Sequence, residues 1–331
     1  MKTQPTLKLI GALLAVTLTG AISNVAVAQN ANADSYPERA VRIVVPVSAG
    51  GSTDKIARII SEKLGSLWKQ TVIVENLTGA GGAIGAAQVA RAQPDGYTLV
   101  LHSDAIVLNT ILLSKSPYSL GDLTGVIRAA VNPQVLVANP DFEVKDFSQY
   151  IAYAKKHPGE LSLGLPTSGG IAHIAHEVLA KSAGIDVNYI PYKGGAPAAM
   201  DVMAGHINAT VITLAAVTEQ IKTGRLRALA VTTDYRSPLF PDLPTMAESG
   251  YPDVNVESWQ GILAPKNTPQ AIIDKINKDV TAVVNDPATK KQIEDLGFGV
   301  STNTSAEFAT MLQEVHKNYA EVIKAAGIAQ Q

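Results

Sequence analysis

Cysteine is absent from the 331-residue sequence, which excludes disulfide bonds, cysteine nucleophiles, thiolate metal sites and a lipid anchor on an N-terminal cysteine. Aromatic residues are few, at 5% of the chain. Beyond the first thirty residues no run reaches eighteen apolar residues, so we expect no membrane-spanning helix there. Neither sign of charge predominates, with 27 Lys and Arg against 29 Asp and Glu. No run of like charges stands out, and we expect no nucleic-acid partner.

The first 28 residues have the pattern of a cleavable signal peptide. Lys2 and Lys8 give it a positive start, an apolar stretch follows, and Ala26 and Ala28 are the small residues that a signal peptidase needs. Thr and Gly interrupt the apolar stretch, and it is short for a spanning helix, although an N-terminal anchor is the alternative. Cleavage would leave residues 29–331, with 25 basic and 29 acidic side chains. We therefore expect a periplasmic protein without a lipid anchor.

From residue 36 onward, strand-like and helix-like segments alternate. Short apolar runs are typical of buried parallel strands, and apolar residues at helical spacing follow them. Strands are expected at residues 41–46, 71–76, 97–101, 135–138, 161–164, 187–190 and 226–231, and helices at 53–68, 82–92, 146–157 and 171–183. Residues 269–326 are expected to be mainly helical, with a helix starting at Asp286 and Pro287. The opening β-α-β-α-β order predicts a doubly wound α/β sheet.

The alternating pattern occurs twice, which predicts two Rossmann-like lobes. A single hydrophobic core stops growing near roughly 250 residues, and residues 29–331 exceed that length. We expect the first lobe to comprise residues 29–133 and 255–331, and the second to comprise residues 134–254. The chain would then cross a hinge twice. Chain continuity alone does not prove the return to the first lobe.

Four glycine loops precede helices, at the position where open α/β sheets bind their ligands. In the first loop, Gly50 and Gly51 lead to a helix N-terminus, whose free N–H groups attract anions. Ser52 and Thr53 add hydroxyl groups. An ordinary glycine turn capped by Ser52 or Thr53 explains the same residues. Asp54 is explained by the helix dipole and needs no role as a catalytic base.

The second loop, residues 76–85, is close to a dinucleotide-binding fingerprint. It follows the second strand, however, and lacks an acidic residue at the expected distance, so we expect no cofactor. The third loop, residues 167–173, places His173 in the first turn of a helix, where it could donate to a carboxylate. His173 and His176 stand three residues apart with Glu177 beside them, so a zinc site is the alternative, but the chain supplies no obvious third ligand. We expect no metal, and favour a structural role for His176.

The fourth loop, residues 191–197, contains Lys193, which faces either a ligand or, as most lysines do, solvent alone. The chain has no Gly-x-Ser-x-Gly motif, and no serine has a histidine and an acid at motif spacing. An exported hydrolase would need such a nucleophile. We therefore predict that the protein is not an enzyme and keep the hydrolase as a remote alternative.

Together these segments resemble the Bug receptors, the TctC-like substrate-binding proteins of tripartite tricarboxylate transporters. The similarity runs in order from Tyr36 to the C-terminus. The segments that carry it are 36–46 (YPERAVRIVVP), 49–54 (AGGSTD), 74–85 (VENLTGAGGAIG), 94–99 (PDGYTL), 191–194 (PYKG), 224–232 (GRLRALAVT), 241–245 (PDLPT) and 258–261 (SWQG).

The resemblance implies a two-lobe, type II periplasmic-binding-protein architecture of the Venus-flytrap kind. Such a receptor grips a ligand carboxylate by backbone amides of the first and third loops, often with bridging waters. The implied partners are one large and one small membrane subunit of a transporter, and we expect a monomer. Carried over by position, the expected ligand-binding residues are Ala49, Gly50, Gly51, Thr53, Asn76, Ser103, Thr167, Ser168, Gly169, Ile171 and His173.

Two segments depart from the family pattern. Residues 209–216 are apolar apart from two threonines, where family members often carry Asp or Asn beside an aromatic residue. Residues 102–104 read His-Ser-Asp in place of the more usual Gly-Ser-Asn type. An amino-acid ligand, whose ammonium group needs an acidic partner, is therefore disfavoured. We expect a dicarboxylate, or a carboxylic acid with an apolar or aromatic body; sensing for a membrane signalling partner is the alternative to transport.

Overall fold

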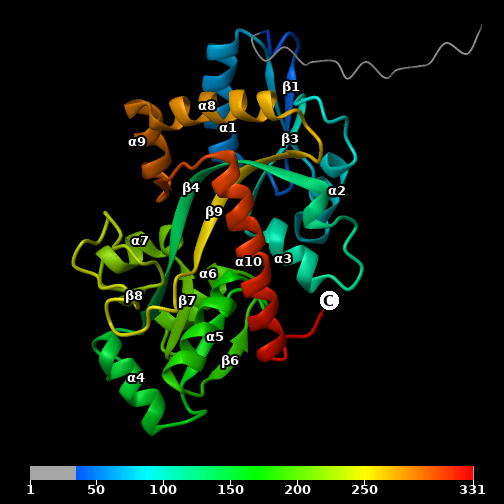
Figure 1. Cartoon of the computed structure of the whole chain (residues 1–331). Coiled ribbons are helices and arrows are strands. Elements are labelled where there is room, and N and C mark those ends of the chain that lie inside the picture. The colour runs from blue at the N-terminus through cyan, green and yellow to red at the C-terminus, as the bar shows by residue number, and fades with distance from the viewer. Residues whose placement is uncertain (1–34, 331) are drawn as a thin grey trace, which may run out of the picture. The chain divides into compact units, whose positions relative to one another are not determined.

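The computed structural model describes residues 35–330, so the predicted signal peptide lies outside the described residues. Figure 1 shows helices packed around one strongly twisted mixed sheet. Its main strand order is β2-β1-β3-β9-β4-β7-β5-β6, and β8 and β10 each pair with β4. None of the helices in the described part of the chain is long and apolar enough to cross a membrane.

The first half of the sheet contains the predicted β-α-β-α-β unit. Strands β1, β2 and β3 are parallel, and β1 is almost entirely buried because helices cover both of its faces. A 3-10 turn, Ala80–Gly82, precedes the second helix. The elements are β1 (Val41–Val45), α1 (Ser52–Trp68), β2 (Val72–Asn76), α2 (Ala83–Ala90) and β3 (Thr98–Ser103).

The second half of the sheet is built in the same way. Strands β5, β6 and β7 are parallel, with β5 in the middle. Strand β8 lies on the other side of β4. The elements are α4 (Phe147–Lys156), β5 (Ser162–Leu165), α5 (Ile171–Ala183), β6 (Asn188–Pro191), α6 (Gly195–Met203), β7 (Ala209–Thr213), α7 (Leu214–Lys222) and β8 (Arg227–Val231).

Two long antiparallel strands join the halves. Strand β4 (Leu123–Ala138) pairs with β9 (Glu257–Pro265) in the first half and with β7 and β8 in the second. The expected strand at residues 135–138 is only the end of β4, and β9 and β7 were not expected. Pro133 and Gly125 interrupt the apolar pattern of β4. Its length therefore comes from pairing with two half-sheets, which local sequence does not encode.

The C-terminal region is helical, as expected, and returns to the first half of the sheet. Asp286 accepts a hydrogen bond from Ala288 N–H and so caps the second of its helices. The short strand β10 (Gly299–Val300) also pairs with β4, in the antiparallel direction. The three helices are α8 (Gln270–Asn285), α9 (Pro287–Asp295) and α10 (Ser305–Ala325).

Helix α10 packs against both halves, as Figure 1 shows. Phe308 and Leu312 belong to the core that contains Trp259, in the first half. Tyr319 and Ile323 belong to the core of the second half. A short helix that was not expected, α3 (Ala105–Leu112), also contributes to both cores. The two halves therefore share packing along α3 and α10 besides the crossing strands.

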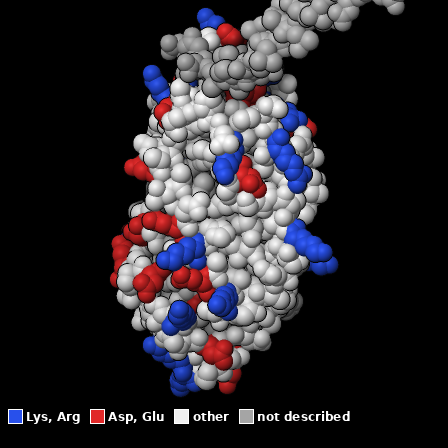
Figure 2. Space-filling model, turned by 45° about the vertical axis from the view of Figure 1, so that its right-hand side comes forward, with Lys and Arg blue, Asp and Glu red and all other residues white. Residues whose placement is uncertain are grey.

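Charged side chains are unevenly distributed on the face shown in Figure 2. Acidic side chains gather in the lower half of that face, with a few basic ones among them. Broad uncharged stretches separate the remaining charges. This face therefore has no continuous stripe of one sign.

Candidate ligand-binding site

The strand registers direct the loops of both halves toward the middle of β4. Ser103 ends β3 and pairs with Gln260 of β9, which in turn pairs with Ala130 of β4. Thr213 ends β7 and pairs with Gln134 of β4. The other parallel strands of each half end at the same edges. The four glycine loops therefore follow strand ends that approach one short stretch of β4 from opposite sides.

The helices that follow three of these loops begin without a side-chain cap. Helices α1, α5 and α6 each start after a glycine, and no side chain caps them. Side chains of Asp146, Asp286 and Thr304 cap α4, α9 and α10. Helices α7 and α8 also lack such a cap. Because the first N–H groups of a helix have no partner within it and carry partial positive charge, α1, α5 and α6 present donors for an anion.

The first loop is held by the Asp54 carboxylate. This carboxylate accepts hydrogen bonds from Gly50 N–H (2.8 Å), from Arg58 Nε (3.0 Å) and from Asn76 Nδ2 (2.9 Å). Asn76 also donates to Val47 O (3.0 Å). Burial raises the pKa of Asp54, but these hydrogen bonds outweigh it and hold the pKa at about 2. The loop is therefore fixed around an ionised carboxylate, and Gly50 N–H is already used.

The free amides of this loop lie just beyond Gly50. The first intrahelical hydrogen bond of α1 runs from Lys55 N–H to Gly51 O (2.9 Å), so the N–H groups of Ser52 and Thr53 precede it. Ala49, Gly50 and Gly51 are exposed, whereas the Thr53 side chain is buried. Asn76 contacts this region through Asp54 and Val47, and it accepts a hydrogen bond from Arg58 Nη2 (3.0 Å). The structure thus brings all the predicted residues of the first loop together with Asn76.

The third loop is held by His173. Gly169 N–H donates to His173 Nδ1 (2.9 Å), and His173 Nε2 lies 3.3 Å from Glu177 Oε1. Thr167 and Ser168 are exposed. The first intrahelical bond of α5 runs from Ile174 N–H to Gly170 O (3.0 Å). The predicted donor His173 thus has both ring nitrogens engaged within the protein.

The free donors of the third loop are therefore backbone groups. The N–H groups of Ile171 and Ala172 precede the first intrahelical bond of α5. Ile171 is the first residue of the helix and is half-buried. Its position relative to α5 is the same as that of Ser52 relative to α1. Each half of the fold thus offers two successive amides in the first turn of a helix that follows a glycine and has no side-chain cap.

His176 is part of the core below this loop. Its Nε2 lies 2.8 Å from Tyr150 Oη and its Nδ1 lies 2.9 Å from Tyr189 Oη. Burial lowers the pKa of His176 to about 3. In the described part of the chain, no group of three or more His, Asp or Glu side chains is arranged to hold a metal ion. These contacts give His176 the structural role that the sequence favoured.

The second loop is closed on itself. Gly82 N–H and Ile84 N–H donate to Gly79 O, and Ala83 N–H donates to Ala80 O. These bonds occupy the amides that a dinucleotide pyrophosphate would need. Gly82 has φ +97°, and a Cβ atom there would collide with His102 Nε2. Only glycine therefore fits this turn.

His102 lies directly beneath that turn. Its side chain is buried, and neither ring nitrogen has a hydrogen-bond partner among the described residues. Burial lowers the pKa of His102 to about 4, against a smaller opposing effect of the Gly81 backbone. The ring is therefore neutral at pH 7.

Helix α3 links the loops of the two halves. Asn109 Nδ2 donates to Gly81 O (2.9 Å) in the second loop. At the other end of α3, Leu112 packs so close to Gly169 that a Cβ atom there would lie 3.0 Å from it. These contacts were not expected from the sequence, although the apolar run of α3 is compatible with a short helix. Gly194 N–H of the fourth loop donates to Pro166 O (2.8 Å), which places that loop beside the third; Lys193 is exposed.

Ser103 stands where β3 ends and α3 begins. Its hydroxyl accepts a hydrogen bond from Ala105 N–H (3.3 Å). The adjacent Asp104 is buried and accepts a bond from Ser258 Oγ (2.6 Å). Burial raises the pKa of Asp104 to about 6, although the hydrogen bonds oppose the shift. The end of β3 is thus tied to the start of β9.

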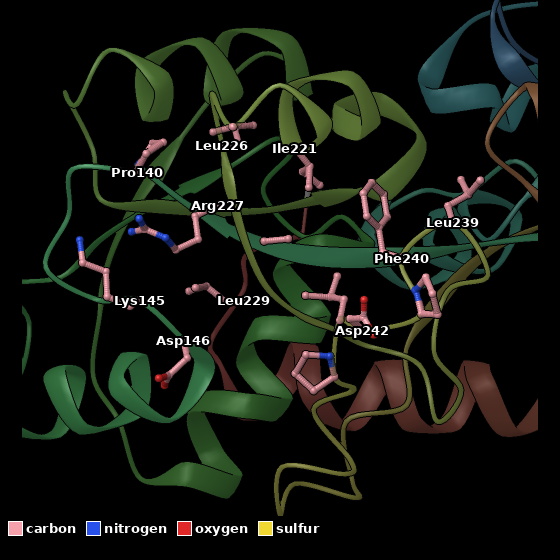
Figure 3. Close-up of a pocket in the computed structure, with 15 residues that line it drawn as sticks. Pro140, Lys145, Asp146, Ile221, Leu226, Arg227, Leu229, Leu239, Phe240 and Asp242 are labelled. Carbon is pink, nitrogen blue, oxygen red and sulfur yellow. The ribbon is translucent and has the colours of Figure 1, made fainter.

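A pocket of about 680 Å³ lies elsewhere, along strand β8 (Figure 3). Arg227 donates to Val144 O (3.1 Å), and its head group points to the same side of the pocket as Lys145. The lining includes Leu226, Leu229 and Phe240 but none of the predicted ligand-binding residues. This pocket is separate from the loops that follow the strand ends.

The chain is similar in sequence and in fold to proteins of one known family. The family model described as "Tripartite tricarboxylate transporter family receptor" (TctC) matches residues 56–328. Protein BugT of Bordetella pertussis is 35% identical over 309 residues, covering 92% of this chain and 95% of BugT. The solved structure of Rpa4515 from R. palustris with adipate is 31% identical, with a TM-score of 0.75, covering 89% of this chain and 99% of that one.

A second solved structure, MatC from Rhodopseudomonas palustris with bound malate, is 28% identical. Its TM-score is 0.70, and the match covers 87% of this chain and 100% of MatC. The periplasmic binding protein BugD is also similar, with 36% identity and a TM-score of 0.71 over 89% of this chain and 100% of BugD. The chain thus has the two-lobe architecture of a periplasmic solute-binding protein and is not an enzyme. The chain described here therefore belongs to the tripartite tricarboxylate transporter receptor family, the TctC or Bug family of periplasmic solute-binding proteins.

Proposed function

We propose that this receptor captures a small carboxylate between two lobes and delivers it to a tripartite tricarboxylate-type transporter. The lobes would comprise residues 29–133 with 255–331, and residues 134–254. The observation that carries the proposal is the matched pair of free helix N-termini. Helix α1 belongs to one half of the sheet and α5 to the other, and the strand ends before them approach the same stretch of β4.

The geometry favours a carboxylate that touches both helices. The amides of Ser52 and Thr53 would bind from one side, and those of Ile171 and Ala172 from the other. Each hydrogen bond to a charged group contributes about 1.5–3 kcal/mol. Four such bonds, less desolvation and closure, are enough for the roughly −8 kcal/mol of a micromolar receptor. A ligand stabilises a closed state only by contacts that the open state lacks.

The remaining predicted residues fall into two roles in this proposal. Asn76 and His173 hold the loops in place, through Asp54 and through Gly169 N–H respectively. The other predicted residues surround the ligand, with hydroxyl groups available from three of the loops or strand ends. These residues are Ala49, Gly50, Gly51, Thr53, Ser103, Thr167, Ser168, Gly169 and Ile171.

The ligand class is a dicarboxylate or a carboxylic acid with an apolar or aromatic body. Adipate and malate in the related structures support a dicarboxylate. Residues 209–213 of β7 are largely buried and apolar, and no acidic side chain lies in that strand to pair with an ammonium group. An amino-acid ligand is therefore disfavoured.

Export completes the proposal. We infer that the leader is cleaved after Ala28 and that the protein then acts in the periplasm without an anchor, in contact with one large and one small membrane subunit. Mass spectrometry of protein isolated from the periplasm would give a chain that begins at Gln29. A chain that still begins at Met1 and sediments with membranes would contradict this step.

A thermal-shift screen tests the binding function. The panel would contain dicarboxylates, tricarboxylates, aromatic acids, nicotinate and amino acids. A ligand present at 100 times its dissociation constant adds about 2.7 kcal/mol to the free energy of unfolding, which raises the melting temperature visibly. We expect shifts with dicarboxylates or apolar acids. Shifts with amino acids alone would overturn the ligand class, and no shift with any anion would overturn the function.

A further inference from the structure

A second cavity, of about 950 Å³, lies where α5 and α10 meet. The segment 253–256, which leads into β9, passes beside it. Its volume is within the range of small-molecule sites, about 300–1,000 Å³. None of the predicted ligand-binding residues lines it. The lining residues are Ile174, Glu177, Val178, Lys181, Ser182, Asp253, Asn255, Val256, Val315, Asn318, Tyr319, Glu321, Val322, Ala325 and Ala326.

The floor of this cavity is apolar apart from one hydroxyl group. Ile174 and Val256 are buried, and valines of α5 and α10 complete the floor. Tyr319 also lines it and is only 7% exposed. Among the described residues, its hydroxyl has no hydrogen-bond partner. Because Tyr319 lines the cavity and its hydroxyl is not bonded within the described residues, that oxygen is available to a molecule bound there.

Acidic side chains outnumber basic ones in the lining of this cavity. Burial is the main cause that raises the pKa of Tyr319, and the carboxylates of Asp104 and Glu257, the second of which is paired with Arg128, raise it further. Asp253 and Glu321 are exposed on the rim, and neither forms an ion pair within the described residues. Lys181 is the single basic residue of the lining. The lining therefore carries three acidic side chains, Glu177, Asp253 and Glu321, against this one basic side chain.

We propose that this cavity binds a small organic cation, with a protonated amine on an apolar body. The apolar floor disfavours a hydrated metal ion, and the acidic rim disfavours an anion. An ammonium group, in contrast, donates hydrogen bonds to carboxylates and to the Tyr319 oxygen. A chain of several carbons would cover the valines of α5 and α10.

One lining residue also belongs to the carboxylate site and is unsuitable for the test. Glu177 contacts His173 Nε2 (3.3 Å), which holds Gly169 N–H. Substitution of Glu177 would disturb both sites together. Tyr319→Phe removes a hydroxyl without a partner, and Glu321→Gln removes one rim charge. Glu314→Gln is the matched control, because Glu314 is an exposed acid of α10 outside the lining.

The test is a titration of the purified protein with hexylamine, followed by amide chemical shifts in NMR spectra. We expect saturable shifts in α5 and α10 with a dissociation constant of about 1 mM or lower. Hexanol should bind at least fivefold more weakly. Tyr319→Phe and Glu321→Gln should each weaken hexylamine binding, by about two- to fivefold, and Glu314→Gln should leave it unchanged.

Three results would overturn the proposal. These are no shifts at the cavity with hexylamine, equal binding of hexanol, or binding that neither Tyr319→Phe nor Glu321→Gln weakens. A hexanoate titration keeps this test separate from the carboxylate function. Hexanoate should leave the cavity unperturbed, and its shifts, if any, should fall in the first and third loops.

Discussion

His102 and His176 are neutral in the folded protein because each ring is buried. Their pKa values fall to about 4 and about 3, mainly through loss of hydration. An unfolded histidine titrates near 6.5. Between these values the unfolded state binds more protons than the folded state, so the free energy of unfolding decreases as the pH falls below 6.5. For His176 the loss from pH 7 to pH 5 is about 2 kcal/mol.

His176→Gln should remove this acid sensitivity. Glutamine still offers a donor and an acceptor to Tyr150 and Tyr189 but does not titrate. Asp104 has the opposite effect on the free energy of unfolding. Because its pKa is raised in the folded state, that state gains stability as Asp104 takes up a proton. Asp104 is present in the unmodified protein and in the variant alike, so its effect cancels in the comparison. Urea unfolding at pH 7 and pH 5 should therefore show a pH-dependent loss that is smaller in the variant by about 2 kcal/mol. Equal losses would show that His176 takes up its proton while the protein remains folded.

Two glycines, one at each end of helix α5, allow an effect on ligand binding to be distinguished from an effect of backbone strain alone. Gly169 precedes the helix and Gly184 follows it, and both have positive φ, +73° and +63°. A Cβ atom on Gly169 would lie 3.0 Å from Leu112, whereas one on Gly184 would meet nothing within 4 Å. Alanine at either position costs about 1–2 kcal/mol of backbone strain. Only Gly169→Ala should also displace the third loop.

Carboxylate binding should therefore distinguish the two variants. Calorimetry with the best ligand of the screen should show affinity at least about tenfold lower for Gly169→Ala, equivalent to about 1.4 kcal/mol. Gly184→Ala should bind as the unmodified protein does, with a similar loss of thermal stability. Equal affinities for the two variants would remove the third loop from the site.

At the scale of helices and strands, the sequence predicted the features that depend on residues close together in the chain. Glycine turns, apolar runs and caps located α1, α5, the parallel strands other than β7, and the four loops, because each depends on neighbouring residues. The pairing of β4 with β9 was not predictable, since antiparallel partners such as Pro133 and Glu257, which are 124 residues apart, leave no local pattern. Nor could sequence show that Asp54 uses Gly50 N–H and that His173 uses Gly169 N–H. Because of those contacts, the free amides are not those of Gly50 and Gly169 but those that follow along the chain, at the start of α1 and α5.

At the scale of the whole molecule, the two halves are connected by the crossing strands β4 and β9. Arg128 of β4 and Glu257 of β9 form a largely buried ion pair (2.6 Å). Tyr235 Oη donates to the same carboxylate (2.7 Å), and Arg128 also donates to Ser301 Oγ (2.7 Å). These contacts tie both halves to the crossing. A buried charge that loses its partner is strongly destabilising.

Glu257→Gln should therefore lower the free energy of unfolding by about 3 kcal/mol, because Arg128 stays buried without a counter-charge. Asp295→Asn is the matched comparison. It removes an exposed pair with Lys291 (2.7 Å), and such pairs contribute less than about 1 kcal/mol. Chemical denaturation measures both. If the two substitutions had equal effects, the crossing would not depend on the Arg128–Glu257 pair.

The most direct test of the account is to locate a bound carboxylate by amide chemical shifts. Adipate and malate would be titrated first, then the best ligand of the thermal screen. The account predicts large, concerted shifts of Ser52 and Thr53 at α1 and of Ile171 and Ala172 at α5, with one dissociation constant. Shifts confined to one helix, or located in neither, would contradict capture of a carboxylate between the two halves of the fold.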